Sequence, residues 1–448
     1  MSGGGEEARH EVTDPYRTDG RVADRPLRRA CRLGRRVVQL SQGQLYYTTY
    51  TDGAVRLVLR PLTQVAGAGG VAGAVLLGPE QQLGTVANNA ISASSGRLVF
   101  DGRARTYTGQ VRVMGGNALL GREASGNRAL VQDWNGPLLE QTSYADLYDA
   151  KTQTVRNIGA TSPDLPQPPP AWPQGPQDVD GNYFLRARSD GSVTRRDWQT
   201  GREIVVHQAF PLPIQAVAIH GPWVAWVTAC SPWPCAQSVS WRNLSTGTAT
   251  SIGTRGTLGL DISGGHLVLD VVPGAADTRQ LRTIRFGSAQ ATPIGLLPLY
   301  PAWGMSADMF GSEPRHFDIE DETIAWIGRD GRGHVAPLAP SIDPPHYLGN
   351  SIAPASFSTR WAIAVPVSKA LPTCTVTIYR GTTKVRILNC ANTIGMVSVV
   401  WDGRTGGGAV LPAGTYTYRV SGRDDDGYWL RHYDGTLRAV AGTVTKTS

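Results

Sequence analysis

With 448 residues and a formal net charge of +7, the chain is long enough for two or three domains with one large and one small core. Its 53 glycines and 30 prolines, beside a hydrophobic share of 41%, indicate a turn-rich β protein and exclude a wholly disordered chain. No window of about 20 consecutive apolar residues is present, which excludes a membrane-spanning helix.

The N-terminal segment 1–36 is basic and lacks apolar periodicity, with nine arginines between Arg9 and Arg36. We predict a disordered, solvated tail, or an upstream extension from a misassigned start codon. A nucleic-acid-binding arm is the alternative. The stretch after Arg36, VVQLSQGQLYY, is too polar and too short for the apolar part of a signal peptide.

From residue 37 to residue 338 one unit recurs: a short strand, a turn, a second strand rich in Leu, Val or aromatic residues, and a further hairpin. The turn and second strand recur at 43–47, 96–100, 126–131, 181–185, 221–226, 265–269 and 321–326. The mean spacing of about 46 residues is the size of one four-stranded propeller blade. We therefore predict an all-β chain with a seven-bladed β-propeller, six or eight blades being alternatives.

Several repeats continue into a polar hairpin, at 145–159, 193–206 and 239–253. Their pattern resembles the outer hairpins of propellers of the TolB-like and WD40-like groups, without the WD40 signature itself. The resemblance implies blades that pack on their neighbours, so the Trp and Tyr residues of the repeats are expected at blade contacts.

Two inserts and a linker interrupt this rhythm. Residues 65–75 are small and flexible and are expected to form a loop, and residues 162–177 form a proline-rich surface connection, or a polyproline segment that docks on a partner. Pro340, Pro344 and Pro345 mark residues 339–346 as a linker, because proline cannot donate to a sheet. The remaining residues, 347–448, are expected to form a separate domain.

The C-terminal stretch from Val397 to Val420 alternates apolar and polar residues around two turns. Its distinctive residues are Trp401, Asp402, Gly403, Pro412, Ala413, Gly414, Tyr416 and Tyr418. This pattern resembles the FlgD-like Ig domain, which occurs at the C-terminus of exported bacterial proteins. The resemblance covers residues 347–448 and implies a small β-sandwich used as a module, with these eight residues in structural roles and no chemistry of its own.

Five cysteines bear on the cellular compartment. Cys374 and Cys390 flank a hairpin whose turn lies near Gly381, and symmetric pairing about Thr382 places them face to face for a disulfide. A register shifted by one residue, which makes them diagonal neighbours, suits the apolar pattern better. Cys230 and Cys235 enclose a tight loop that fits a second bridge or two free thiols, and Cys31 is left over. Paired cysteines indicate an oxidising compartment.

Candidate catalytic and metal sites are weak. Asp178-Val179-Asp180-Gly181-Asn182 resembles the opening of a calcium loop but lacks the later bidentate carboxylate, so a polar turn is expected there. The acidic run 424–426 suits an ordinary turn between two strands. The acidic residues of 318–322 lead into a blade strand and could act as paired carboxylates only if two of them converge in one cleft, and no nucleophile elbow is complete. We predict no catalytic residues, no metal site and no cofactor.

These features together favour a non-enzymatic, exported or cell-surface binding protein. The propeller is the platform for a protein or glycan partner, and the Ig-like domain is a spacer or docking module. One alternative is an enzyme in the propeller channel, a lyase or hydrolase of carbohydrate or cell-wall fragments. The other is a cytoplasmic scaffold that binds nucleic acid through its basic tail; nucleic acid is otherwise not an expected partner, and the sequence does not indicate an oligomeric state.

Overall fold

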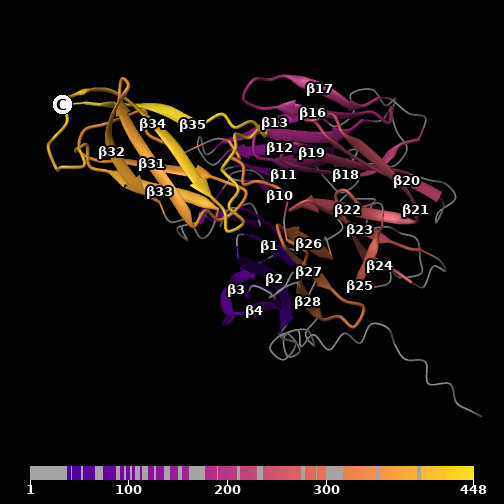
Figure 1. Ribbon diagram of the computed structural model, residues 1–448. Coiled ribbons are helices and arrows are strands. Elements are labelled where there is room, and N and C mark those ends of the chain that lie inside the picture. The colour runs from indigo at the N-terminus through magenta and orange to yellow at the C-terminus, as the bar shows by residue number, and fades with distance from the viewer. Residues whose placement is uncertain are drawn as a thin grey trace, which may run out of the picture.

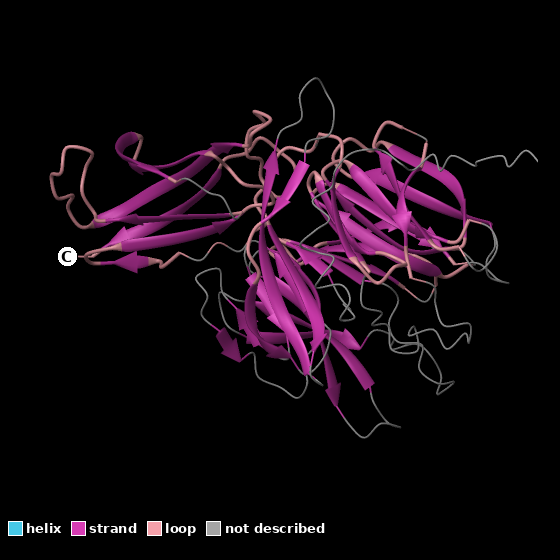
Figure 2. Ribbon diagram, turned by 90° about the horizontal axis from the view of Figure 1, so that it is seen from below, coloured by secondary structure: helices cyan, strands magenta, loops and turns pink. Residues whose placement is uncertain are grey.

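The computed structural model describes residues 38–447, apart from residues 42, 52–53, 66–73, 87–90, 95–96, 101–102, 106–110, 114–119, 126–127, 136–141, 150–153, 161–176, 189, 209–211, 230–235, 274–277, 289, 299–315, 341, 350, 352 and 391–394. The described residues form strands, turns and loops and contain no helix (Figures 1 and 2). In this part of the chain nothing helical has the length and apolarity to cross a membrane.

The first part of the chain folds into consecutive antiparallel sheets. The first sheet holds β1 (Val38–Leu40), β2 (Gln44–Thr51), β3 (Ala54–Val65), β4 (Ala74–Leu77) and β5 (Gln81–Val86). The second and third hold β6 (Ile91–Ser94), β7 (Arg97–Phe100), β8 (Arg103–Arg105) and β9 (Val111–Val113), then β10 (Leu120–Ser125), β11 (Arg128–Asn135), β12 (Thr142–Asp149) and β13 (Thr154–Ala160).

Four further sheets follow in the same order. The fourth and fifth hold β14 (Gln177–Asp180), β15 (Tyr183–Ala187), β16 (Val193–Asp197) and β17 (Glu203–His207), then β18 (Ile214–His220), β19 (Trp223–Thr228), β20 (Ala236–Asn243) and β21 (Ala249–Arg255). The sixth and seventh hold β22 (Thr257–Ser263), β23 (His266–Val271), β24 (Gln280–Arg285) and β25 (Thr292–Leu296), then β26 (Phe317–Glu320), β27 (Thr323–Ile327) and β28 (Gly333–Pro337).

The sheets are arranged as a β-propeller. The first strand of each sheet contacts the first strand of the next, and β26 contacts β1, so that the ring closes. Apolar clusters fill the spaces between neighbouring sheets, for example where Leu267 and Leu269 of β23 pack with Val239 and Trp241 of β20. Seven sheets make this ring among the described residues; the blade count of the whole chain stays a prediction, because residues 161–176 and 299–315 lie outside them.

The repeats read from the sequence correspond to the second strands β2, β7, β11, β15, β19, β23 and β27. The hairpins at 145–159, 193–206 and 239–253 coincide with the third and fourth strands of their sheets. The expected loop at 65–75 is wrong at both ends, because Val65 ends β3 and Ala74 begins β4, which pairs with β3. Residues 1–37 and 161–176 lie outside the described residues, as do Cys31, Cys230 and Cys235.

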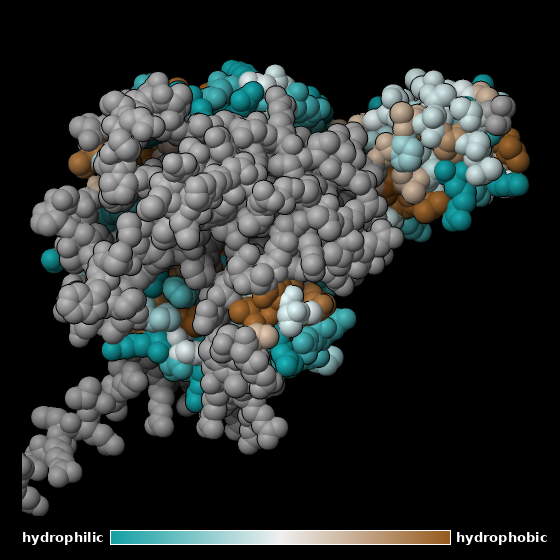
Figure 3. All heavy atoms as spheres, turned by 180° about the vertical axis from the view of Figure 1, so that it is seen from behind, coloured by the Kyte–Doolittle hydropathy of each residue, from teal (hydrophilic) through white to brown (hydrophobic). Residues whose placement is uncertain are grey.

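The C-terminal part is a sandwich of two sheets. The larger sheet has the order β29-β35-β34-β31-β32, and the smaller pairs β30 with β33. The strands are β29 (Ser356–Phe357), β30 (Trp361–Pro366), β31 (Thr373–Arg380), β32 (Thr383–Asn389), β33 (Met396–Trp401), β34 (Gly414–Arg423) and β35 (Val440–Lys446). Trp361 and Trp401 are fully buried between the sheets. The sandwich projects to one side of the propeller, as the view from behind also shows (Figure 3).

Candidate functional site

The end of the propeller that faces the sandwich carries the turns between the first and second strands of the sheets. In four of them, Gly181, Gly221, Gly264 and Asp321 have φ of 53°, 55°, 57° and 50°. These left-handed values are typical of two-residue hairpin turns, where glycine is favoured because it has no Cβ. We call this surface the turn end.

The segment 339–349 lies across the turn end. A Cβ atom on Gly181 would stand 2.1 Å from the carbonyl oxygen of Leu348, and one on Gly265 would stand 2.3 Å from the Ile342 side chain. Glycine is therefore required at these turns for close approach as well as for φ. The linker expected from its prolines packs on the propeller and buries Asp343, Pro345 and His346, and we call this contact the domain junction.

A buried histidine pair and a carboxylate lie in the junction. The Nε2 atom of His346 lies 3.0 Å from Oδ2 of Asp180, which also accepts a hydrogen bond from the Gly221 amide. The His220 ring meets the His346 ring edge-on, with centroids 5.1 Å apart. Burial acts to raise the pKa of Asp180, but the charge and hydrogen bond of His346, aided by His220 and the Gly221 amide, hold that pKa far below its usual value.

His220 itself is buried, and burial lowers its pKa; the Asp180 carboxylate opposes this effect only in part. The pKa values of both groups are lowered, which means that the Asp180 carboxylate is strongly ionised while His220 resists protonation. The group of Asp180, His220 and His346 therefore holds the segment 339–349 on the propeller. It contains no serine, threonine or cysteine nucleophile.

Asp343 of the linker joins two blades to the junction. Its Oδ1 accepts from Nε1 of Trp223 at 3.2 Å, and its Oδ2 accepts from the Gly265 amide at 2.8 Å. The His266 ring lies 3.0 Å from the carbonyl oxygen of Ala339. Because Trp223 and Gly265 belong to consecutive sheets, the linker is held by both of them.

The two acidic runs, 318–322 and 424–426, meet around one lysine. Nζ of Lys369, which is buried, lies 2.8 Å from Oδ1 of Asp321 in the propeller and 3.8 Å from Oδ2 of Asp424 in the sandwich. Burial raises the pKa of Asp424 and of Asp426, against the charge of Lys369. The Lys369 ammonium group therefore supplies positive charge to this cluster of carboxylates. Among the described residues, no group of His, Cys, Asp and Glu side chains has the geometry of a metal site.

The loop between β34 and β35 makes a third contact with the propeller. The Tyr433 ring meets the Tyr183 ring edge-on at 5.5 Å, and the Ser245 hydroxyl donates to the Asp434 carbonyl oxygen at 3.2 Å. Tyr433 is buried in the apolar cluster between the fourth and fifth sheets. The sandwich thus touches the propeller through the linker, through Lys369 and through this loop.

The calcium-loop residues have a different role, which joins neighbouring blades. Oδ2 of Asp178 in β14 accepts from the Ile219 amide of β18 at 2.7 Å. Asp318 in β26 accepts in the same way from the Leu40 amide of β1 and so closes the ring. Sequence analysis missed this function, although the pattern was visible. An Asp that is followed by Val or Ile precedes the first turn residue by three positions at 178, 261 and 318.

The predicted disulfide is present between Cys374 and Cys390, with Cα atoms 4.9 Å apart. The pairs Thr375 with Asn389 and Val376 with Leu388 show the symmetric register about Thr382. The register shifted by one residue occurs only at the turn, after an irregularity between Ile378 and Tyr379. The apolar pattern was misleading because Ile387 lies on the outer face of the sheet and is exposed.

The motif residues of the sandwich have structural positions. Nε1 of Trp401 donates to the Arg404 carbonyl oxygen at 3.0 Å, and its ring lies 5.2 Å from that of Tyr416. The Tyr416 hydroxyl donates at 2.6 Å to the carbonyl oxygen of Pro412, which fixes the turn before its own strand. Asp402 caps the turn by accepting from the Arg404 amide at 3.0 Å, and Gly403 has φ of 71°. Tyr418 is buried, which raises its pKa to about 12, while Ala413 is exposed and Gly414 begins β34.

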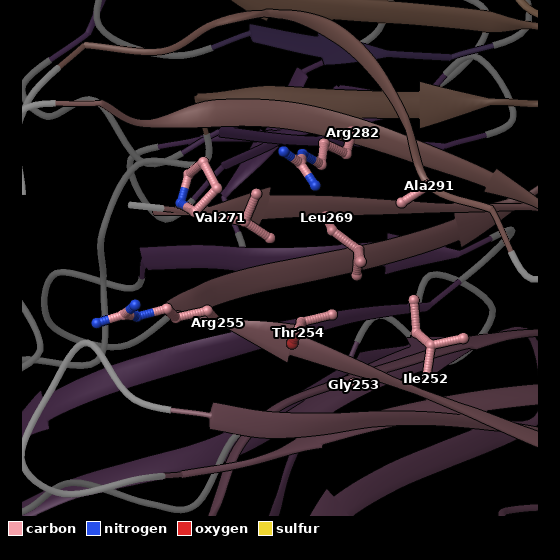
Figure 4. A pocket seen from close by; sticks show the side chains of 9 residues that line it. Ile252, Gly253, Thr254, Arg255, Leu269, Val271, Arg282 and Ala291 are labelled. Atoms are coloured by element: carbon pink, nitrogen blue, oxygen red, sulfur yellow. The ribbon is translucent and has the colours of Figure 1, made fainter. Parts of the chain in front are cut away.

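A crevice of about 270 Å³ lies between the fifth and sixth sheets (Figure 4). Leu269 and Val271 of β23 form its apolar floor, and Arg255 and Arg282 stand at its sides. Arg282 is engaged with Gln280 through Nε at 3.1 Å and Nη2 at 2.9 Å, and Arg255 points away from the other lining side chains. The crevice is below the roughly 300 to 1,000 Å³ of ordinary ligand pockets, so the junction is the better-built feature.

Comparisons with known proteins bear on the sandwich. Residues 349–426 match the family model described as the FlgD Ig-like domain. This match confirms the predicted resemblance of the C-terminal part, while the TolB-like and WD40-like resemblance stays a prediction. A search of the curated proteins finds no match to this chain.

Solved structures give remote similarities. The computationally designed Ika8 protein is 14% identical, with a TM-score of 0.38 over 68% of this chain and 96% of its own. PorZ of Porphyromonas gingivalis, described as an essential bacterial surface component of the type-IX secretion system, is 12% identical, with a TM-score of 0.35 over 92% of this chain and 59% of its own. At these TM-scores the similarities carry no argument about function.

Proposed function

We propose that this protein is an exported, non-enzymatic binding protein. The propeller is the platform for a protein or glycan partner, and the Ig-like sandwich is a docking module fixed to its turn end. The observation that carries the proposal is the Cys374–Cys390 disulfide, because such bridges persist in oxidising compartments and are rare in the cytosol. The FlgD Ig-like match over residues 349–426 supports a modular, interaction role.

The chemistry of the junction supports binding rather than catalysis. Asp178 and Asp318 accept hydrogen bonds from the backbone of neighbouring blades, and Asp343 accepts from the turn end. Carboxylates used in this way position backbone and do not act as an acid and base pair. The channel-enzyme and cytoplasmic-scaffold alternatives have no comparable support from the described residues.

The test is the intact mass of the protein from each fraction of its native cells, after alkylation without reductant, followed by peptide mapping. We expect the protein in the envelope or the medium, with Cys374 and Cys390 in one bridged peptide pair. A cytosolic protein with both of these thiols alkylated would contradict the proposal and would make the basic segment 1–36 the leading feature.

A further inference from the structure

The outer face of the five-stranded sheet in the sandwich has an unusual composition. Side chains of a strand alternate between the two faces of the sheet, and Cys374, Val376 and Ile378 of β31 point into the core. The alternate residues of β31, Thr373, Thr375 and Thr377, therefore lie on the outer face. On the neighbouring strands Thr417 of β34 stands opposite Thr443 of β35. We call this surface the threonine face.

The threonine face is positively charged. None of its five strands contains an aspartate or glutamate, whereas Arg419 and Arg423 of β34 and Lys384 of β32 lie on the outer positions. In the acidic run that follows β34, Asp424 faces Lys369 at the junction, and Asp425 and Asp426 lie in the turn beyond the strand. An anionic partner therefore meets positive charge and hydroxyl groups without a repelling carboxylate on the strands.

Two aromatic side chains accompany the arginines. The Arg419 guanidinium lies 5.3 Å from the Tyr379 ring centroid, and that of Arg423 lies 3.8 Å from the Trp429 ring centroid. Trp429 is 49% exposed, although a tryptophan is usually buried. Arg419 and Arg423 are four residues apart on one strand, or about 13 Å, which suits an extended ligand better than a compact one.

We propose that the threonine face binds an anionic polysaccharide that carries carboxylate groups, such as a uronic acid polymer. Arginine binds carboxylates through paired N–H groups, exposed aromatic rings pack against apolar faces of sugars, and threonine hydroxyls hydrogen-bond to sugar hydroxyls. The inference that the partner is anionic rests on the charges of the face alone. The choice of a glycan over a nucleic acid rests in addition on the proposed export.

The experiment is a calorimetric titration of the full chain with polygalacturonate at low salt, with dextran as the neutral polymer. We expect binding to polygalacturonate that weakens as salt is added, and none to dextran. The double variant Arg419→Ala/Arg423→Ala should bind about tenfold more weakly. The matched control, Arg255→Ala/Arg360→Ala, removes two exposed arginines elsewhere and should bind as the unmodified chain does.

A second variant protects the test against misfolding. Ser421→Glu keeps both arginines and places a carboxylate between them on β34, so it should also weaken binding, while its thermal unfolding should match that of the unmodified chain. The proposal is overturned if polygalacturonate does not bind, if both variants bind normally, or if single-stranded poly(dT) binds as tightly and competes. Because purified protein is used, these outcomes are distinct from a failure of the localisation test.

Discussion

Asp178 and Asp318 show how single side chains close the propeller. Each is buried in the first strand of its sheet and accepts a backbone amide from the first strand of the next sheet. A buried carboxylate is costly unless it is hydrogen-bonded, and here the partner is an amide that faces no strand of its own sheet. The bond formed by Asp318 joins residues 278 positions apart, so it ties the last sheet to the first.

We therefore expect Asp318→Ala to destabilise the protein by about 2 kcal/mol, because the Leu40 amide then stays buried without its acceptor. Urea unfolding measures the loss. Asp425→Ala, which removes an exposed carboxylate, is the control and should change the free energy of unfolding by less than about 0.5 kcal/mol. Equal effects of the two substitutions would refute the ring-closing role.

Buried histidines make the protein sensitive to acid. Burial lowers the pKa of His220 and His266, and it lowers the pKa of His316 to about 4, aided by the charge of Arg279. As the pH falls below about 6.5, these three imidazole rings therefore bind protons in the unfolded chain before they do so in the folded chain. The stability they contribute is complete above that pH and is lost as the pH falls towards each folded pKa.

For His316 the expected loss at pH 5 is about 2 kcal/mol relative to pH 7.5. Urea unfolding of the unmodified chain and of His316→Gln at both pH values measures it, since glutamine does not titrate. The variant should lose less stability on acidification than the unmodified chain. An identical loss in both proteins would show that His316 takes no part in the acid response.

At the scale of elements, the hairpin turns of the turn end determine how closely the linker approaches. Gly181 and Gly201 both have left-handed φ, 53° and 73°, and both precede a strand of the fourth sheet. A Cβ on Gly181 meets the Leu348 carbonyl group, whereas one on Gly201 meets nothing within 4 Å. Substitutions at Gly181 and Gly201 therefore separate two contributions to the loss of stability: the strain of a left-handed φ, and the loss of packing by the linker.

Gly201→Ala should cost about 1 kcal/mol for its backbone conformation alone. Gly181→Ala should cost about 2 kcal/mol more, because the segment at Leu348 must move. Thermal denaturation of the two variants measures the difference. Similar melting temperatures for both would mean that the linker does not pack on this turn.

The disulfide is the second element-scale device. It joins adjacent strands β31 and β32 across a separation of 16 residues. Loop closure of this size stabilises the folded state by about 3 kcal/mol. Cys374→Ala/Cys390→Ala should lose that amount in guanidinium unfolding, and reduction of the unmodified chain should reproduce the loss. A variant as stable as the oxidised parent would contradict a stabilising bridge.

Local patterns predicted the second strand of each sheet and the outer hairpins well, because glycine turns and apolar alternation are short-range signals. The junction was not predicted, since His346, Asp343 and Lys369 act on turns that lie up to about 170 positions away in sequence. Proline in the linker indicated a boundary but not that the segment packs on the propeller. The Asp that recurs at 178, 261 and 318 was visible, but the acceptor role of Asp178 and Asp318 depends on the neighbouring blade.

At the scale of the molecule, the propeller and the sandwich are joined by buried polar contacts and by Tyr433, which enters the apolar cluster of the fourth and fifth sheets. The sandwich occupies the turn end, and the threonine face lies on the sheet that contains β31 and β34. We expect the propeller to be a folding unit in its own right, because its ring closes through Asp318 without help from the sandwich.

The most direct test is thermal unfolding of the chain with residues 347–448 removed, beside the full chain. We predict that the remaining chain keeps a β-type circular dichroism spectrum and unfolds cooperatively. Its melting temperature should be lower, because the contacts of Leu348, Lys369 and Tyr433 with the propeller are lost. A truncated chain without cooperative unfolding would contradict the account of a self-closed propeller carrying a docked module.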